Sequence, residues 1–171
     1  MQFVIYILLR GSILIIGMLP WFVLNILGQL LYVIIYHLLR YRRNVVYQNL
    51  CIAFSDKDSD SIKILEKQFY RHLIKLLLET LKGFHLSNNY IHERFTLDEK
   101  LDDLLSGDTK VILVGAHQGN WEWACRVGGF ISQNPFYVLY SPLKNTFIDQ
   151  YLQSIRAISQ SKMIPFADVR S

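Results

Sequence analysis

The sequence predicts an α/β fold with a mainly parallel sheet flanked by helices, preceded by an apolar amino-terminal helix or helical hairpin that anchors the chain in a membrane. Apolar runs typical of strands alternate with helical patterns from residue 110 onward, and such alternation builds parallel sheets. An uncharged, largely apolar stretch lies near the amino terminus. The chain is also 51% hydrophobic and only 19% charged, which is more apolar material than a soluble domain of this size normally needs.

The amino-terminal segment, residues 1–40, is predicted to be the anchor. Its uncharged stretch from Gly11 to Tyr36 has 26 residues, whereas a helix needs about 20 to cross a bilayer. Pro20 interrupts the stretch, and the polar residues Asn25 and Gln29 follow. Two arrangements therefore stay open: a tilted spanning helix, and a monotopic hairpin of two shorter helices in the interface. A pair of buried core helices in a soluble protein is the third alternative.

Positive charge is concentrated directly after this segment. Arg40, Arg42 and Arg43 follow the apolar stretch, whereas only Arg10 and the amino terminus precede it. The positive-inside rule then places the rest of the chain in the cytoplasm. The net charge of +4 suits an anionic membrane surface or an acidic partner. The basic residues form no recognisable nucleic-acid-binding motif, so no nucleic acid partner is expected.

Two helices are predicted next. Residues 41–50 form the first, and a polar break at 55–59 precedes a longer one, for which Ser59, Asp60 or Ser61 can supply the cap. Apolar residues at spacings of three and four predict one buried face of the longer helix, made of Ile62, Leu65, Phe69, Leu73, Leu76 and Phe84. Basic residues recur along another face, at Lys63, Lys67, Arg71 and Lys75. This stripe is either a solvated surface or a contact with phospholipid headgroups or an acidic carrier protein.

The remainder of the chain alternates between helices and strands. The expected elements are a helix at 98–105 with Gly107 as its stop, a strand at 110–116, a helix at 120–131, a strand at 136–140, a helix at 146–158 and a strand at 162–166. Three strands are fewer than a doubly wound fold normally has. The sheet is therefore predicted to be incomplete in this chain.

The residues that carry chemistry follow the predicted strand at 110–116. His117 stands at the carboxyl end of this strand, where ligands bind in open α/β sheets, and Glu122 lies in the first turn of the next helix. An imidazole and a carboxylate so placed can act as a general base and its orienting partner, to deprotonate a hydroxyl for attack on an acyl group. Gly119 permits a tight turn, and the amides near Asn120 suit an anion or a developing oxyanion.

No other catalytic pattern competes with this pair. The sequence has no nucleophile elbow, glycine-rich phosphate loop or zinc-ligand spacing, so neither a metal nor a cofactor is expected. Cys51 and Cys125 show no pairing pattern and suit a reducing compartment. Cys125 lies near the His–Glu pair but is interpreted as a packing residue.

The segment around His117 reads Gly115-Ala116-His117-Gln118-Gly119-Asn120-Trp121-Glu122. It resembles the late acyltransferases of lipid A biosynthesis, which belong to the lysophospholipid acyltransferase superfamily. The resemblance covers essentially the whole chain. The apolar amino terminus with Arg42-Arg43 and Asn49-Leu50 is similar to the family's opening. A second block is similar as well, made of Tyr140-x-Pro142-Leu143-Lys144-Asn145 and then Arg156. The chain departs from the family at Gln118, where an aromatic residue is common.

This resemblance implies a glycerolipid-acyltransferase-like fold and the transfer of a fatty acyl chain to a hydroxyl of a lipid A precursor. The acyl donor would be acyl carrier protein, or coenzyme A, used as a co-substrate at the cytoplasmic side of the bacterial inner membrane. The resemblance implies His117 as catalytic base and Glu122 as its orienting residue. The residues expected to bind substrate are Gly119, Asn120, Trp121, Tyr140, Lys144, Asn145 and Arg156.

We therefore expect a membrane anchor at residues 1–40 and the amino-terminal part of an acyltransferase domain at 41–171. The carboxyl-terminal part of that domain is expected to lie outside this chain. Two alternatives stay open. One is an acyltransferase for another membrane lipid, such as a lysophospholipid or an aminolipid. The other is an inactive membrane-anchored homologue that serves in interactions or assembly.

Overall fold

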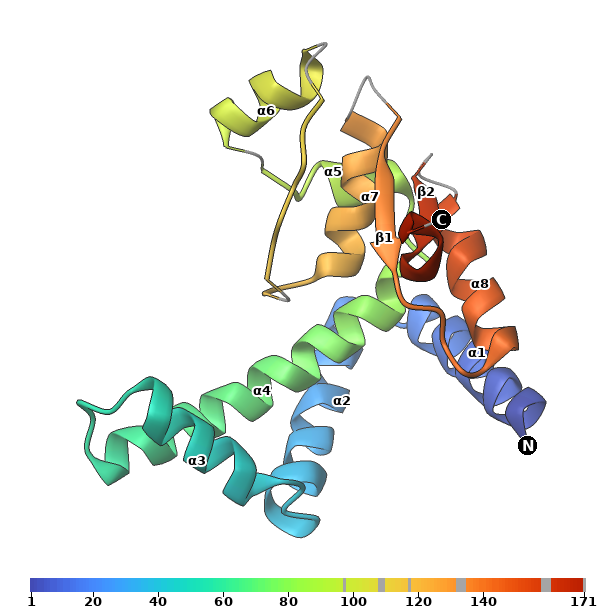
Figure 1. Ribbon diagram of the computed structural model, residues 1–171. Helices are drawn as coiled ribbons and strands as arrows, with labels where there is room; N and C mark the ends of the chain where they lie inside the picture. The colour runs from blue at the N-terminus through green and yellow to red at the C-terminus, as the bar shows by residue number, and fades with distance from the viewer. Residues whose placement is uncertain (97, 108–109, 117, 132–134, 158–160, 171) are drawn as a thin grey trace. The chain divides into compact units, whose positions relative to one another are not determined.

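The computed structural model describes residues 1–96, 98–107, 110–116, 118–131, 135–157 and 161–170 (Figure 1). Contacts within the chain define two compact units. We call residues 18–79 the helical unit, and residues 1–17 together with 80–171 the mixed unit. The predicted division between an anchor and a catalytic domain at residue 40 stays a prediction.

The helical unit begins with the apolar segment. Helix α2 (Trp21–Tyr32) continues without a break into the π-helix η1 (Val33–Leu38). Pro20 occupies the cap position before α2 in an extended conformation, and helix α1 (Gln2–Met18) ends before it. Proline thus divides the apolar segment into separate helices. Trp21–Leu38, with 18 residues, is long and apolar enough to cross a membrane by its length and composition.

Helices α3 (Arg43–Ala53) and α4 (Ser59–Gly83) follow in the helical unit. The cap of α4 differs from the prediction, because the Asp58 carboxylate accepts a hydrogen bond from the Ser61 amide at 2.7 Å. This bond lowers the pKa of Asp58 below its usual value. None of Ser59, Asp60 and Ser61 plays this part, since the helix already begins at Ser59.

The predicted buried face of α4 is wrong in phase. Its buried side chains step by four, at Ile62, Glu66, Tyr70, Ile74, Leu78 and Lys82. Of the predicted face Ile62 is buried, whereas Phe69 and Leu73 are exposed. The reason is Glu66, only 2% exposed, whose carboxylate accepts hydrogen bonds from Arg43 Nε at 2.9 Å and Nη2 at 3.3 Å. A buried carboxylate is tolerated when it is paired. The pairing with Arg43 therefore allows Glu66 to lie on the buried face of α4.

The mixed unit contains α1 up to Gly17, the last residues of α4 from Thr80, and everything after α4. Its helices are α5 (Asn88–His92), α6 (Glu99–Ser106), α7 (Trp121–Ile131) and α8 (Thr146–Ala157), and its strands are β1 (Tyr137–Tyr140) and β2 (Lys162–Pro165), followed by the 3-10 helix η2 (Phe166–Arg170). Helix α1 packs on α8 through aromatic pairs, with ring centroids 5.5 Å apart for Phe3 and Phe147 and 6.0 Å for Tyr6 and Tyr151. These contacts attach the first apolar helix to α8 within this unit.

The two strands pair in parallel, with Tyr137 opposite Lys162 and Tyr140 opposite Pro165. Helix α8 connects them and contacts β2, while α5 packs against α7 (Figure 1). The predicted helix–strand order after residue 98 is therefore confirmed, apart from one element. Asp98 and Gly107 also bound α6 as predicted, because the Asp98 carboxylate accepts a hydrogen bond from the Lys100 amide at 3.0 Å.

The predicted buried strand at 110–116 is wrong. This segment is described throughout and has no regular structure, and the side chains of Ile112 and Val114 are 90% and 93% exposed. A strand needs a neighbour for its ladder of hydrogen bonds, and the described residues form a sheet of β1 and β2 alone. A full α/β sheet is accordingly not present in the described parts of this helix-rich chain.

Candidate active site

The predicted catalytic motif leads into the first turn of α7. His117 lies outside the described residues, so its part in the motif stays a prediction. Gly119 has a φ of +66°, in the left-handed region that glycine adopts without strain. Apart from its chain neighbours, no described residue has an atom within 4 Å of the place where its Cβ would be, so the positive φ is the reason for glycine that the described residues give. The chain then turns into α7 at Trp121.

Glu122 is the best-defined residue of the motif. It lies in the first turn of α7 and is 8% exposed. Its carboxylate pairs with the guanidinium of Arg156 on α8: Arg156 Nε donates to Oε2 at 2.9 Å, and Nη2 donates to Oε1. This is the bidentate geometry that arginine forms with carboxylates. The pair joins the two sequence blocks that carry the family resemblance.

The contact with Glu122 offsets the burial of the Arg156 charge. Burial by itself lowers the pKa of a guanidinium, but the hydrogen bonds and attraction from Glu122 outweigh it and raise the pKa of Arg156 above its ordinary value. A carboxylate has about four acceptor positions, of which this pair fills two. Glu122 therefore keeps acceptor capacity for a second donor, as an orienting role beside an imidazole requires.

Asn120 stands immediately before α7. Its backbone carbonyl accepts hydrogen bonds from the amides of Trp123 and Ala124, at 3.1 and 3.2 Å, and so begins the helix. Its Oδ1 accepts a hydrogen bond from the Thr80 hydroxyl at 3.3 Å. Its Nδ2 is buried without a hydrogen-bond partner among the described residues. Burying a donor without a partner costs folding free energy. An unpaired donor of this kind therefore indicates a functional role for the Asn120 amide.

The second block is positioned by α8. Asn145 caps this helix, because its Oδ1 accepts hydrogen bonds from the amides of Phe147 and Ile148 at 3.1 and 3.3 Å. Gln153 donates to the hydroxyl of Tyr140 at the end of β1. Burial raises the pKa of that phenol.

Lys144 is exposed. Of the predicted substrate-binding residues, Arg156 contacts Glu122, and Trp121 is partly exposed at the start of α7.

A family model described as bacterial lipid A biosynthesis acyltransferase matches residues 2–171 of the sequence. The chain belongs to this family. The lipid A biosynthesis acyltransferase family gives the chain its general activity, acyl transfer, and confirms the resemblance inferred from the segment around His117. Neither a curated protein nor a solved structure matches the chain significantly.

One further residue of this family member, Arg126, was not predicted from its sequence. Arg126, one helical turn after Glu122, is 5% exposed, and its Nη2 donates to the Leu86 carbonyl at 2.8 Å and to Asn88 Oδ1 at 2.6 Å. Burial lowers the pKa of Arg126. It ties α7 to the chain after α4 and thereby fixes the helix that carries Glu122. The sequence could have indicated this role through one feature: Arg126 is a single arginine four residues after Glu122 in an otherwise apolar predicted helix.

Cys125 of the acyltransferase lies on the same helix. Burial, and then the negative charge of Glu122, raise the pKa of its thiol, while Arg156 opposes them. Its backbone carbonyl accepts a hydrogen bond from Ser161 at 2.9 Å. A thiol with a raised pKa is a weak nucleophile near neutral pH, which agrees with its interpretation as a packing residue. The described residues contain no group of three or more potential metal ligands.

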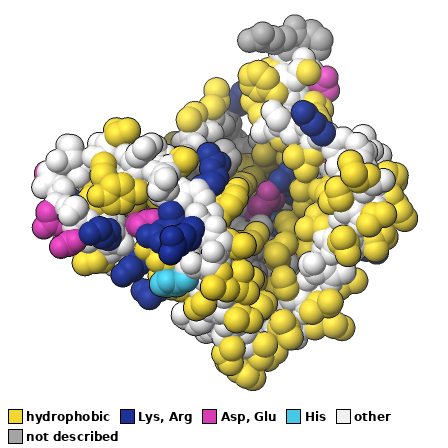
Figure 2. Space-filling model, turned by 90° about the horizontal axis from the view of Figure 1, so that it is seen from below, with side chains coloured by type: hydrophobic (Ala, Val, Ile, Leu, Met, Phe, Trp, Pro, Cys, Tyr) yellow, Lys and Arg dark blue, Asp and Glu magenta, His cyan; other side chains and the backbone are white. Residues whose placement is uncertain are grey.

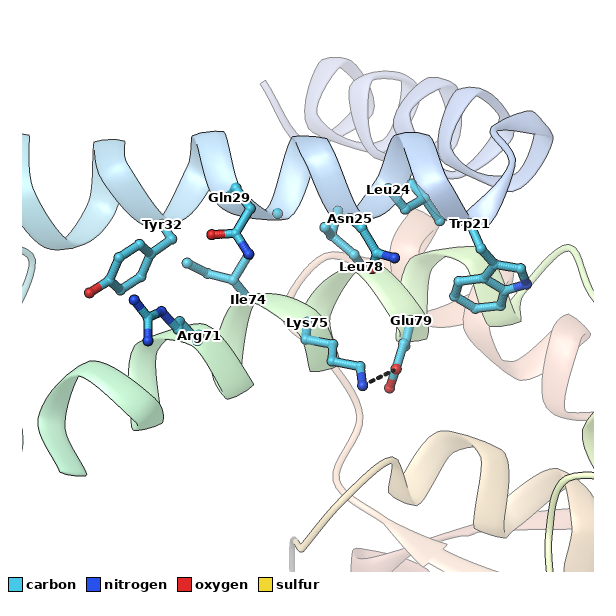
Figure 3. Close-up of a pocket in the computed structure, with 11 residues that line it drawn as sticks. Trp21, Leu24, Asn25, Gln29, Tyr32, Arg71, Ile74, Lys75, Leu78 and Glu79 are labelled. Atoms are coloured by element: carbon cyan, nitrogen blue, oxygen red, sulfur yellow. Dashed lines mark ion pairs between the residues drawn. The ribbon is translucent and has the colours of Figure 1, made fainter. Parts of the chain in front are cut away.

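The basic stripe of α4 is partly engaged within the helical unit. A pocket of about 190 Å³ lies between α2 and α4, and Figure 3 shows Asn25, Gln29 and Tyr32 lining its α2 side. Arg71 lies over the Tyr32 ring, 4.8 Å from its centroid, and Lys75 pairs with Glu79 at 3.7 Å. The polar residues of the apolar helix thus face charged residues of α4.

Proposed function

We propose that this family member transfers a fatty acyl chain from the thioester of acyl carrier protein to a hydroxyl of a lipid A precursor. His117 takes the proton of the acceptor hydroxyl as its oxygen attacks the thioester carbonyl. The tetrahedral intermediate collapses as the carbon–sulfur bond breaks, and the proton held by His117 passes to the leaving thiolate. The products are an ester on the acceptor and the free thiol of the carrier.

The observation that carries this proposal is the buried pair between Glu122 and Arg156. A general base works best when a second group holds its orientation, and that group must itself be held. Arg156 fixes the Glu122 carboxylate from α8 and leaves acceptor positions for an imidazole N–H. We therefore assign Glu122 as the residue that orients His117 and stabilises its cation, and Arg156 as a positioning residue.

Asn120 supports a second element of the same mechanism. Its Nδ2 is a buried donor without a partner in the described residues, and it stands next to the Gly119 turn. Attack on a thioester places negative charge on the carbonyl oxygen, and a preorganised donor stabilises that charge. We assign the Asn120 amide as a donor to this oxygen.

The apolar helix supports a place at the membrane for this chain. Trp21–Leu38 is long and apolar enough to enter a bilayer, and Arg40, Arg42 and Arg43 come directly after it. We propose that the chain is held at the inner membrane with the acyltransferase residues on its cytoplasmic side, where acyl carrier protein and a membrane lipid acceptor both have access. No metal or cofactor takes part in the proposed steps.

An acyl-transfer assay tests this assignment. Membranes that contain the protein are incubated with acyl carrier protein that bears a radiolabelled acyl chain. The acceptor is a lipid A precursor, a lysophospholipid or an aminolipid. We expect transfer to the lipid A precursor, and a decrease of roughly 100- to 10,000-fold in His117→Ala, the range for the loss of a general base. Glu122→Gln, which removes the charge but keeps the shape, should decrease transfer as well.

Glu93→Gln is the matched control, because this glutamate is exposed and pairs only loosely with Arg94, at 3.7 Å. It should transfer at the unchanged rate. Unaltered transfer in His117→Ala would refute its role as base. Transfer to a different lipid would keep the mechanism and change the acceptor, whereas no transfer to any lipid would favour an inactive homologue.

A further inference from the structure

The loop after the apolar helix contains two arginines in an unusual backbone conformation. Arg40 has a φ of +48° and Arg42 a φ of +53°, and they are the non-glycine residues with positive φ in the described part of the chain. In this left-handed region the Cβ of an L-residue is crowded, so glycine is the ordinary occupant. Strained positions of this kind cluster where a side chain has a function.

The loop is held in this shape by its surroundings in the helical unit. The Tyr41 amide donates to the Ile35 carbonyl at 3.1 Å, and the Tyr70 hydroxyl donates to the Tyr41 carbonyl. Arg43 is fixed by the buried carboxylate of Glu66, 2.9 Å from its Nε. These contacts hold the backbone of the loop, so the fold maintains the left-handed conformation of Arg40 and Arg42.

Two positive charges of this loop are not neutralised. Arg43 is paired with Glu66, and Lys63 with Asp60 at 3.0 Å. Arg40 and Arg42 are exposed and have no ion-pair partner within the described residues. Both line a pocket of about 640 Å³, whose other walls include Asn44, Tyr47 and Glu66, the last paired with Arg43. A preformed, positively charged pocket with amide and phenol groups on its wall suits a phosphate group.

The position of the pocket indicates where that phosphate comes from. Arg40 is the second residue after Leu38, the last residue of the 18-residue apolar helix. Side chains of this helix such as Ile26 and Leu30 are exposed, as they would be against lipid. A helix of this length that enters a bilayer ends at the level of the headgroups. Figure 2 shows a group of Lys and Arg side chains on the face that it displays.

We propose that Arg40 and Arg42 form a binding site for the phosphate of an anionic phospholipid headgroup. The two arginines belong to the helical unit and the residues of acyl transfer to the mixed unit, and the proposal does not depend on the proposed acceptor or donor. Near a membrane surface each basic residue contributes about a fivefold increase in affinity for anionic lipid. The two arginines together should therefore account for a factor of roughly 25.

A lipid-binding measurement on the full chain in a nonionic detergent tests the proposal. Short-chain phosphatidylglycerol is titrated into the protein, and the bound lipid is counted by native mass spectrometry. Phosphatidylcholine, inorganic phosphate and acyl carrier protein are titrated separately. We expect the tightest binding with phosphatidylglycerol, and a loss of about 25-fold in the double variant Arg40→Gly/Arg42→Gly.

The glycine variant separates function from structure. Glycine relieves the backbone strain at both positions, so the thermal midpoint of the variant should be unchanged or higher while lipid binding falls. The double variant Arg40→Gln/Arg42→Gln should lose binding with the strain still present, and Arg40→Lys/Arg42→Lys should keep most of it. The control Lys100→Gln/Lys110→Gln makes the same charge change at exposed positions of the mixed unit and should bind as the unaltered chain does.

Three results would overturn the proposal. Undiminished phosphatidylglycerol binding in both the glycine and the glutamine variant would exclude these arginines from the site. Equal affinity for inorganic phosphate would identify a free anion as the ligand, and a loss confined to acyl carrier protein binding would identify a protein partner. Because the measurement involves no acyl transfer, a failure here leaves the proposed enzymatic function untouched.

Discussion

The Glu122 carboxylate shows what a single residue requires of its surroundings. It is buried at the start of α7, and Arg156 supplies both its charge balance and two hydrogen bonds. Pairs of this kind are costly to break from one side, because the remaining charge stays buried. Residue-scale predictions therefore concern what happens when one partner of Glu122 is removed.

Arg156→Ala should destabilise the protein by about 3 kcal/mol, since it leaves the Glu122 carboxylate buried and unpaired. The double variant Glu122→Gln/Arg156→Ala should recover a large part of that loss. The free energy of unfolding in detergent checks this. Lys75→Ala breaks the exposed pair with Glu79 and should change stability by less than about 0.5 kcal/mol. Equal effects of Arg156→Ala and Lys75→Ala would show that the buried pair has no special weight.

Cys125 gives a pH-dependent prediction. Burial raises the pKa of its thiol, so at pH 8 the thiolate fraction is below that of an ordinary cysteine, whose pKa is about 8.5. In a Cys51→Ser background, iodoacetamide labelling of the native protein should be slow at pH 7–8 and increase up to and beyond pH 9. Cys125→Ser, which leaves Cys51, measures the other thiol. Rapid labelling of Cys125 at pH 7 would contradict the raised pKa and indicate a reactive thiol.

At the scale of elements, local signals were predictive and pairing across the fold was not. Asp98 and Gly107 bound α6 as expected because caps act within one turn. The strand at 110–116 failed because strand formation depends on a distant partner. The buried face of α4 was predicted from apolar side chains alone, whereas Arg43 makes Glu66 a buried residue. Arg126 was missed for the same reason, since its partners lie about forty residues away in sequence.

The packing of α7 against the segment before β1 gives a prediction at this scale. A Cβ added at Gly128 would lie 2.5 Å from the Phe136 ring, closer than real Cβ contacts, so Gly128→Ala should cost about 1–3 kcal/mol. Gly11 in α1 has no atom within 4 Å of such a Cβ, and Gly11→Ala should stabilise its helix by about 0.5–1 kcal/mol. Thermal unfolding of both variants checks the opposite signs. Stabilisation by Gly128→Ala would contradict the contact with Phe136.

At the scale of the whole molecule, the candidate site was predictable only in part. The sequence around His117 identified the family, and the family model confirms it. Glu122 and Arg156 are 34 residues apart in sequence and lie on two different helices, and no local pattern specifies such a pair. The cap that Asn145 gives to α8 and the hydrogen bond that Tyr140 accepts from Gln153 were not predicted either, and the binding of substrate by these two residues stays a prediction.

The orientation in the membrane is the prediction that concerns the entire chain. The arginines after Leu38 outnumber the charges before Trp21, so residues after Arg43 should lie in the cytoplasm. Alkaline phosphatase, which is active only in the periplasm, should therefore be inactive when fused after Arg43, and a cytoplasmic reporter fused there should be active. The reversed pair of activities would overturn both the orientation and the proposed access to acyl carrier protein.

The Glu122–Arg156 pair also restricts how members of this family can be recombined. A chimera that takes α7 from one relative and α8 from another inherits a buried acid from one parent and its base from the other. If the parents hold these groups in different registers, the hybrid carries an uncompensated charge in its interior even when each segment is intact. Exchanges should therefore carry residues 121–157 as one block, with a crossover placed before α7 or after α8.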